Sequence, residues 1–95
     1  MLGLATRSRN VVSGGFATEE AVKSGKAYLV IIAEDASDNT RKKYSNMCKF
    51  YEVPYQYYSV KEVLGHAIGK EERSCLAVTD QGFADSIQKH LVDSK

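Results

Sequence analysis

The segment of residues 25–35, GKAYLVIIAED, decides the fold class. Five apolar residues run without interruption from Leu29 to Ala33, and three of them are β-branched. Such a run is typical of a strand that is buried on both faces, in a sheet between two layers of helices. Glu34 and Asp35 follow directly, at the position where an α/β enzyme would keep catalytic groups. The segment therefore leaves two interpretations open, an enzyme or a binding module.

Helical and strand patterns alternate along the rest of the chain. Apolar periodicity and turn residues predict helices over about 3–10, from the glycine pair 14–15 or Thr18 to Gly25, over about 39–51, over about 60–67, and after residues 80–82. The same signals predict strands at 27–33, 55–58 and 75–79. This alternation predicts an α/β fold, with a three-layer α/β/α sandwich.

Within these helices, apolar stripes mark the faces that we expect to be buried. The stripes are formed by Ala21 and Val22; by Tyr44, Met47, Cys48 and Tyr51; by Val63, Leu64, Ala67 and Ile68; and by Phe83, Ala84, Ile87 and Leu91. The acids that follow the glycine pair are expected in the first turn of a helix, where their negative charge would interact favourably with the positive end of the helix dipole. Those acids are Glu19 and Glu20.

Length and composition are those of one globular domain, which we expect to span residues 1–95. No apolar run approaches the roughly 20 residues that cross a bilayer, and the N-terminus lacks a basic region followed by an apolar stretch. We therefore expect a cytoplasmic protein. The net charge of +1 is too small to indicate a nucleic-acid partner by itself.

The titratable residues form no catalytic constellation. Glu34 and Asp35 are neighbours at a strand end, so they point apart rather than forming a pair. Asp80 follows another strand and is explained more simply as a helix cap, and His66 has no Ser or Cys placed beside it. The segment 65–70 lacks the ending and the preceding strand of a phosphate-binding loop. We therefore expect no enzyme and no cofactor.

The two cysteines show no metal-ligand spacing. Cys48 falls in an expected helix and Cys75 in an expected strand. Isolated cysteines in such elements are usually buried thiols. We predict two free, buried thiols and no metal site.

Three polar loops, at residues 13–20, 34–40 and 69–74, carry features that suit RNA. A glycine turn at residues 13–15 opens a helix and would expose backbone N–H groups to a phosphate, with Lys23 and Lys26 one or two turns further on. In the loop 69–74, Lys70 and Arg73 flank two acids, Glu71 and Glu72, so the charge of the loop cancels. Such a loop would position RNA and discriminate between RNAs rather than attract them generally. The basic triplet at 41–43 is explained more simply as a solvated helix face, although a role in binding stays open.

Five motifs follow one another along the chain: SGG at 13–15, GKAYLVIIAEDAS at 25–37, VPY at 53–55, KEVLGHAIGK at 61–70 and LAVTDQGF at 76–83. Their order and spacing resemble the L7Ae/L30e family of ribosomal proteins, in particular its YlxQ-like bacterial members, over about residues 2–92. The resemblance implies an α/β/α sandwich with a mixed four-stranded sheet. It also implies binding of structured RNA, such as rRNA or a kink-turn, and association with the ribosome.

In that family the RNA contacts come from the glycine turn, the start of the next helix, the loop after the long strand and the loop before the last strand. A kink-turn is a sharply bent duplex, and such RNA is recognised through its shape, its backbone and a few unstacked bases. We expect the sheet to hold the Gly14 turn and the Arg73 loop side by side. The resemblance and the loops together predict an RNA-binding set of Gly14, Gly15, Phe16, Thr18, Glu19, Lys23, Lys26, Glu34, Asp35, Lys61, Leu64, Lys70 and Arg73.

The start of the second helix departs from the family pattern. Phe16 and Ala17 stand where the family commonly has Asn-Glu, and Glu20 stands where it has Lys. Asn and Glu would hydrogen-bond guanine edges and Lys would meet a phosphate, whereas Phe16 can only stack or pack. An alternative function is therefore a protein-interaction module on the same fold, with weak or lost RNA affinity.

Overall fold

The computed structural model describes residues 11–67 and 71–93. Along the chain its elements are β1 (Val11–Ser13), α2 (Gly15–Lys23), β2 (Leu29–Ile32), α3 (Asp38–Tyr51), β3 (Tyr55–Tyr57), α4 (Lys61–Ala67), β4 (Cys75–Val78) and α5 (Gln81–Asp93). The helix expected over 3–10 lies outside the described residues. No helix in the described part is long and apolar enough to cross a membrane.

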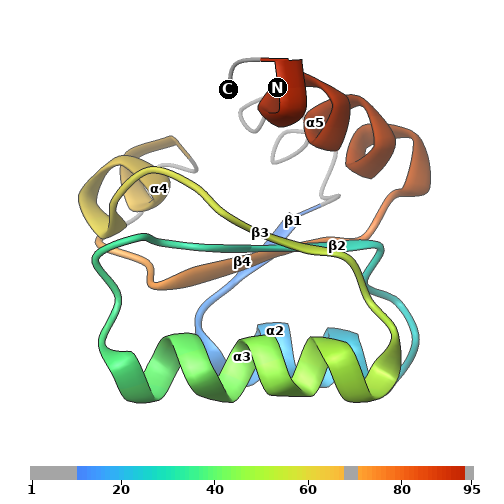
Figure 1. The fold of residues 1–95 in the computed structure, drawn as a ribbon, viewed down its shortest axis with the longest axis horizontal. Helices are drawn as coiled ribbons and strands as arrows, with labels where there is room; N and C mark the ends of the chain where they lie inside the picture. Colours follow the sequence, from blue (N-terminus) through green and yellow to red (C-terminus); the bar gives the residue numbers. More distant parts are fainter. Residues whose placement is uncertain (1–10, 68–70, 94–95) are drawn as a thin grey trace.

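The four strands form one mixed sheet in the order β1-β4-β2-β3. β4 pairs antiparallel with both β1 and β2, whereas β2 and β3 are parallel. Figure 1 shows α2 and α3 on one face of this sheet and α4 and α5 on the other. The predicted α/β/α sandwich with a mixed four-stranded sheet is therefore confirmed.

The two central strands account for the most apolar segments of the sequence. All residues of β2, Leu29–Ile32, have no exposed surface, and those of β4 are buried equally well. Because helices cover both faces of the sheet, these strands need no polar side, and their sequences run apolar without alternation. The fourth strand, β1, was not predicted, since three residues are too few to show an alternating pattern.

Helix boundaries follow local chemistry in most places. The Ser37 hydroxyl accepts a hydrogen bond from the Thr40 N–H (3.2 Å) and caps α3, and the Asp80 carboxylate accepts one from the Phe83 N–H (2.9 Å) and caps α5. The capping interpretation of Asp80 is thus confirmed. α2 begins already at Gly15, so Glu19 and Glu20 lie beyond its first turn, contrary to expectation.

Most of the expected apolar stripes are buried, with exceptions on α3 and α4. Tyr44 and Cys48 belong to the core, but 40% of the Tyr51 surface is exposed. On α4, Leu64 is completely buried whereas Val63, which we expected beside it, is 51% exposed. A seven-residue helix turns only one narrow face to the sheet. Of the other expected stripe residues, Ile68 and the side chains of Ala67 and Leu91 lie outside the described part of the structure. Cys48 and Cys75 are free and buried, as predicted.

Candidate nucleic-acid interface

One end of the sheet gathers the loops that the sequence singled out. In the strand register, Ser13 is opposite Leu76, and Ile32 is opposite both Cys75 and Tyr57. The segments that follow β1, β2 and β3 and the segment that precedes β4 therefore emerge next to one another, toward the left of Figure 1. We call this surface the loop edge and define it as the described segments 13–16, 33–37, 58–62 and 71–75.

Backbone hydrogen bonds fasten the central part of the loop edge. The Gly14 N–H donates to the Cys75 carbonyl (3.3 Å), and the Ala33 N–H donates to the Ser74 carbonyl (2.8 Å). The Glu34 N–H donates to the Ser59 carbonyl (2.8 Å). Because neighbouring segments are linked through their main chains, their mutual geometry is fixed before any ligand arrives.

A second set of contacts fixes α4 and the loop before β4. The Asp35 carboxylate accepts a hydrogen bond from the Lys61 N–H (2.8 Å) and so satisfies the first backbone donor of α4. The Arg73 N–H donates to the Lys61 carbonyl (3.1 Å). Glu71 lies against Gly65 so closely that a Cβ on this glycine would be 1.9 Å from the Glu71 carbonyl oxygen. Gly65 is therefore required for the loop to lie against α4.

The Gly14 turn presents the start of α2 to solvent. Gly14 has φ 88°, a backbone conformation that favours glycine. No side chain in the described part of the chain caps the helix, and its first internal hydrogen bond runs from the Thr18 N–H to the Gly14 carbonyl (3.0 Å). The N–H groups of residues 15–17 thus have no partner within the helix, and the helix dipole is positive here. This turn can accept an anionic group.

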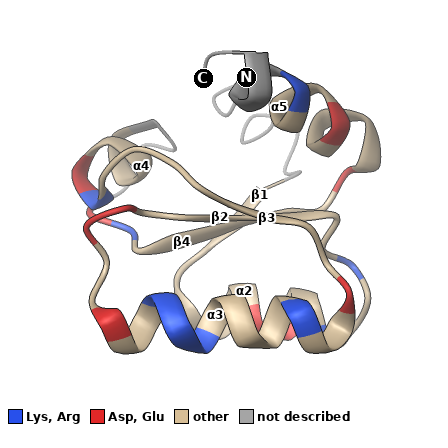
Figure 2. Ribbon diagram, viewed as in Figure 1, with Lys and Arg blue, Asp and Glu red and all other residues tan. Residues whose placement is uncertain are grey.

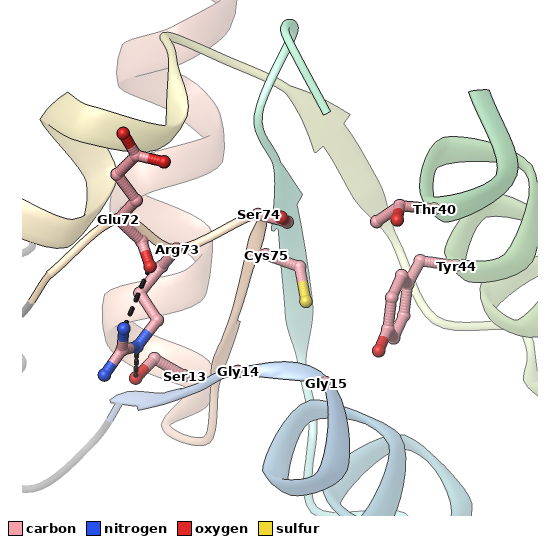
Figure 3. Close-up of a pocket in the computed structure, with 9 residues that line it drawn as sticks. All are labelled: Ser13, Gly14, Gly15, Thr40, Tyr44, Glu72, Arg73, Ser74 and Cys75. Atoms are coloured by element: carbon pink, nitrogen blue, oxygen red, sulfur yellow. Dashed lines mark hydrogen bonds between the residues drawn. The ribbon is translucent and has the colours of Figure 1, made fainter. Parts of the chain in front are cut away.

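Arg73 connects its loop to the Gly14 turn. Its Nε donates to the Ser13 hydroxyl (3.2 Å), and its guanidinium also donates to the backbone carbonyls of Glu72 (2.9 Å) and Glu71 (3.3 Å). Figure 3 shows the side chain bridging the two segments. The expectation that the Gly14 turn and the Arg73 loop lie side by side is confirmed.

A cleft of about 390 Å³ opens beneath the glycine turn, between the starts of α2 and α3 and residues 72–75 (Figure 3). Tyr44 forms part of its wall, and a Cβ on Gly15 would lie 2.8 Å from the Tyr44 hydroxyl oxygen. Burial raises the pKa of Tyr44 to about 12, and burial also raises the pKa of the Cys75 thiol. Both groups are therefore neutral at physiological pH, and neither adds charge to the cleft.

The loop edge carries more negative than positive charge. Its described segments hold five acids, Glu34, Asp35, Glu62, Glu71 and Glu72, against two cations, Lys61 and Arg73, which gives a net charge of −3. Figure 2 shows acidic segments, in red, at this end of the sheet. The loop edge can hold an anion locally at the Gly14 turn, but it does not attract polyanions over a distance.

Comparison with known proteins places the chain in a family. Residues 1–88 match the model described as the Ribosomal protein L7Ae/L30e/S12e/Gadd45 family. The chain belongs to this family. It is 48% identical over 87 residues to the RNA-binding protein YlxQ of Bacillus subtilis (strain 168), which covers 92% of this chain and 87% of that protein.

Two further similarities extend over nearly the whole chain. The RNA-binding protein YlxQ of Enterococcus faecium is 36% identical over 94 residues, 98% of this chain and 88% of that protein. A solved structure of a Bacillus halodurans protein of unknown function is 38% identical, with a TM-score of 0.89 over 93% of this chain and 89% of that one. The resemblance to the L7Ae/L30e family and its YlxQ-like members is thereby confirmed.

The loop edge brings together about half of the residues that the family resemblance selected. These are Gly14, Gly15, Phe16, Glu34, Asp35, Lys61 and Arg73. Two others have buried side chains: neither Thr18 nor Leu64 has any exposed surface, so neither side chain can touch a ligand without rearrangement. Leu64 anchors α4 in the core, and the buried Thr18 hydroxyl has no hydrogen-bond partner among the described residues.

The predicted basic residues after the Gly14 turn are less favourably placed. Lys23 forms an ion pair with Glu19 (2.9 Å), which also approaches Lys43 of α3 (3.8 Å). This ion pair lowers the pKa of Glu19 and raises that of Lys23. Lys26 follows the far end of α2, near Thr79, and is therefore at the opposite end of the sheet from the loop edge. Lys70 lies outside the described residues.

Several contacts within the site have no local signal in the sequence. Asp35 was predicted at a binding surface, but its hydrogen bond to Lys61 spans 26 residues and has no local pattern. Tyr44 was assigned to the core, which is correct, yet it also supports the glycine turn. Ser13 was noted only as part of the turn, whereas it is the partner of Arg73.

Proposed function

We propose that this chain binds structured RNA at the loop edge and acts as a ribosome-associated accessory protein in the cytoplasm, a binding protein rather than an enzyme. The observation that carries the proposal is the rigid pairing of the Gly14 turn with the Arg73 loop. The proposal is also supported by the family to which the chain belongs, whose description names ribosomal proteins. Two relatives that are named RNA-binding proteins support it as well.

The chemistry of the loop edge suits recognition by shape. Unpaired N–H groups at the start of α2 can hydrogen-bond one phosphate, whose position then fixes the RNA relative to the protein. Exposed carboxylates on the neighbouring loops, such as Glu34 and Glu72, accept hydrogen bonds from base amino groups and repel other phosphates. RNA that is bent and has unstacked bases meets both requirements, so we propose a kink-turn or a similarly bent duplex as the target.

At the start of α2, the departures from the family pattern remove polar side chains that could contact RNA. Phe16 is 82% exposed and offers a ring face instead of an amide, and Ala17 offers no polar group. Glu20 is exposed and carries the charge opposite to the lysine of the family pattern. Discrimination must therefore come from the backbone of the turn and from the Arg73 loop, and we expect a modest preference for bent over straight RNA.

The test compares two RNAs of equal length and base composition, one with a kink-turn and one forming an uninterrupted duplex. Affinities are measured at several salt concentrations, because phosphate contacts weaken steeply with salt. Tighter binding of the kink-turn RNA supports the proposal. Equal affinity for both RNAs would remove the kink-turn claim, and no binding of either RNA at low salt would remove RNA binding altogether.

The exposure of Phe16 supports a second candidate, a protein-interaction module. An aromatic side chain that is 82% exposed on the first turn of α2 is a typical interface anchor. Purification of the tagged protein with and without nuclease separates the candidates. A partner that stays bound after nuclease treatment, and is lost in Phe16→Ala, favours the protein module.

A further inference from the structure

Helix α3 differs in charge from the rest of the chain. The chain has thirteen lysines and arginines and twelve acids, which gives a net charge of +1. Four of these cations but only one of the acids, Asp38, belong to α3, so the helix has a charge of +3 while the rest of the chain has −2. Figure 2 shows the basic segments at two places along this helix. Although the net charge of the whole chain is small, α3 is therefore strongly basic.

Three of the four cations of α3, Lys42, Lys43 and Lys49, are exposed, whereas Arg41 is half-buried. Lys42 and Lys49 are seven residues apart, two helical turns, which places them on one face at a separation of roughly 10 Å. Both are exposed, and 56% of the neighbouring Lys43 side chain is exposed as well. The residues of α3 that are buried against the sheet are Tyr44, Ser45 and Cys48. We call Lys42, Lys43 and Lys49 the α3 basic face.

Much of this positive charge is not neutralised within the protein. Arg41 is paired with Asp38, and Lys43 is 3.8 Å from Glu19. In contrast, no carboxylate of residues 11–67 or 71–89 lies within 4.0 Å of the ammonium groups of Lys42 and Lys49. The acids nearest to this face are themselves paired with other cations, Asp38 with Arg41 and Glu19 with Lys23. The three lysines of the face therefore outnumber the charges that could neutralise them.

We propose that the α3 basic face is a second RNA contact, which binds the phosphates of a helical arm that extends from the loop edge. This inference rests on the proposed function and deepens it. α3 begins where the loop edge ends, at Ser37, and runs away from it along one face of the sandwich (Figure 1). Charge complementarity identifies the occupant, since RNA backbones are uniformly anionic. The α3 basic face supplies the attraction that the loop edge, at −3, does not provide.

The experiment uses the full chain with Lys42→Gln, with Lys49→Gln and with both changes. The probes are the kink-turn RNA and the uninterrupted duplex described above, titrated between about 50 and 200 mM salt. Each change should weaken binding to the kink-turn RNA by up to roughly tenfold at the lowest salt and lower the slope of log affinity against log salt by about 1. In the double variant, the slope of log affinity against log salt should decrease by about twice as much as in either single variant.

Lys89→Gln is the matched control, because it removes the same charge from an exposed position on α5, across the sheet from α3. Variants of α3 that bind both RNAs like Lys89→Gln would overturn the inference while leaving the proposed function intact. If α3 variants lost a nuclease-resistant protein partner but kept their RNA affinity, the occupant would be a protein and the inference would be wrong. Absence of RNA binding by the unaltered chain would remove the proposed function and the inference together.

Discussion

Replacing Gly65 by alanine tests whether the close contact between α4 and the loop before β4 organises the site. An ideal Cβ at this position would lie 1.9 Å from the Glu71 carbonyl oxygen and 2.5 Å from the Glu71 carbonyl carbon. Backbone atoms cannot yield in the way that the end of a flexible side chain can. The loop would have to retreat by roughly 1.5 Å before ordinary van der Waals separation is restored.

The expected cost follows from what this retreat disturbs. The Arg73 N–H would lose the Lys61 carbonyl, and its guanidinium would be drawn away from Ser13, each a loss of about 1 kcal/mol. Overpacking against the loop adds about 1–3 kcal/mol, and the higher helix propensity of alanine returns at most about 1 kcal/mol. We therefore expect the free energy of unfolding to fall by about 2–4 kcal/mol, which lowers Tm by roughly 10–30 °C in a domain of this size.

Thermal and urea unfolding followed by circular dichroism measure this loss, and RNA titration measures its effect on the site. Gly82→Ala in α5 is the matched control, because its Cβ would meet only the end of the Asp80 side chain, at 3.2 Å. That variant should be about as stable as the unaltered protein. Unchanged stability and unchanged RNA affinity in Gly65→Ala would refute the argument that this glycine holds the Arg73 loop in place.

Three further changes probe the same region. Arg73→Ala removes the bridge to Ser13 and should weaken kink-turn binding by about 1–3 kcal/mol, with little effect on an uninterrupted duplex; equal losses for both RNAs would contradict a positioning role. Gly15→Ala should cost about 1–2 kcal/mol of stability through its contact with the Tyr44 hydroxyl, and Tyr44→Phe in the same chain should recover part of that loss in a double-mutant cycle. Burial raises the pKa of Cys48 from 9.0 to about 11, so the unfolded chain releases this proton first and stability should decline as pH rises from about 9 to 11; urea unfolding should show a smaller decline in Cys48→Ala.

The fold could be predicted from the sequence to the extent that burial and capping leave local patterns. The uninterrupted run of residues 29–33 indicates a strand covered on both faces, and Ser37 and Pro54 bracket α3. β1 was missed because it is specified by its pairing with β4, more than 60 residues away, rather than by its own three residues. The exposure of Val63 was likewise unpredictable, because helical spacing alone does not say how much of a short helix the sheet can cover.

The site was predictable where the family resemblance named loops and less so where it selected individual side chains. The meeting of the Gly14 turn with the Arg73 loop was expected and is confirmed. Thr18 was selected because it lies near the turn, but its position on the inward side of α2 follows only from where the helix begins. Lys26 was selected for its charge, and a nine-residue helix carries it to the other end of the sheet.

The distribution of charge between the loop edge and α3 has a consequence for selectivity. If the α3 basic face supplies most phosphate contacts, bent and straight RNA gain equally from it, because both present the same backbone charge. The contacts that discriminate between bent and straight RNA then lie at the loop edge. Because these contacts release few counterions, they depend little on salt. The affinities for the two RNAs should therefore fall in parallel as salt is raised, and their ratio should stay constant. A ratio that shrank toward one with increasing salt would mean that phosphate contacts at the glycine turn, rather than shape at the Arg73 loop, carry the discrimination.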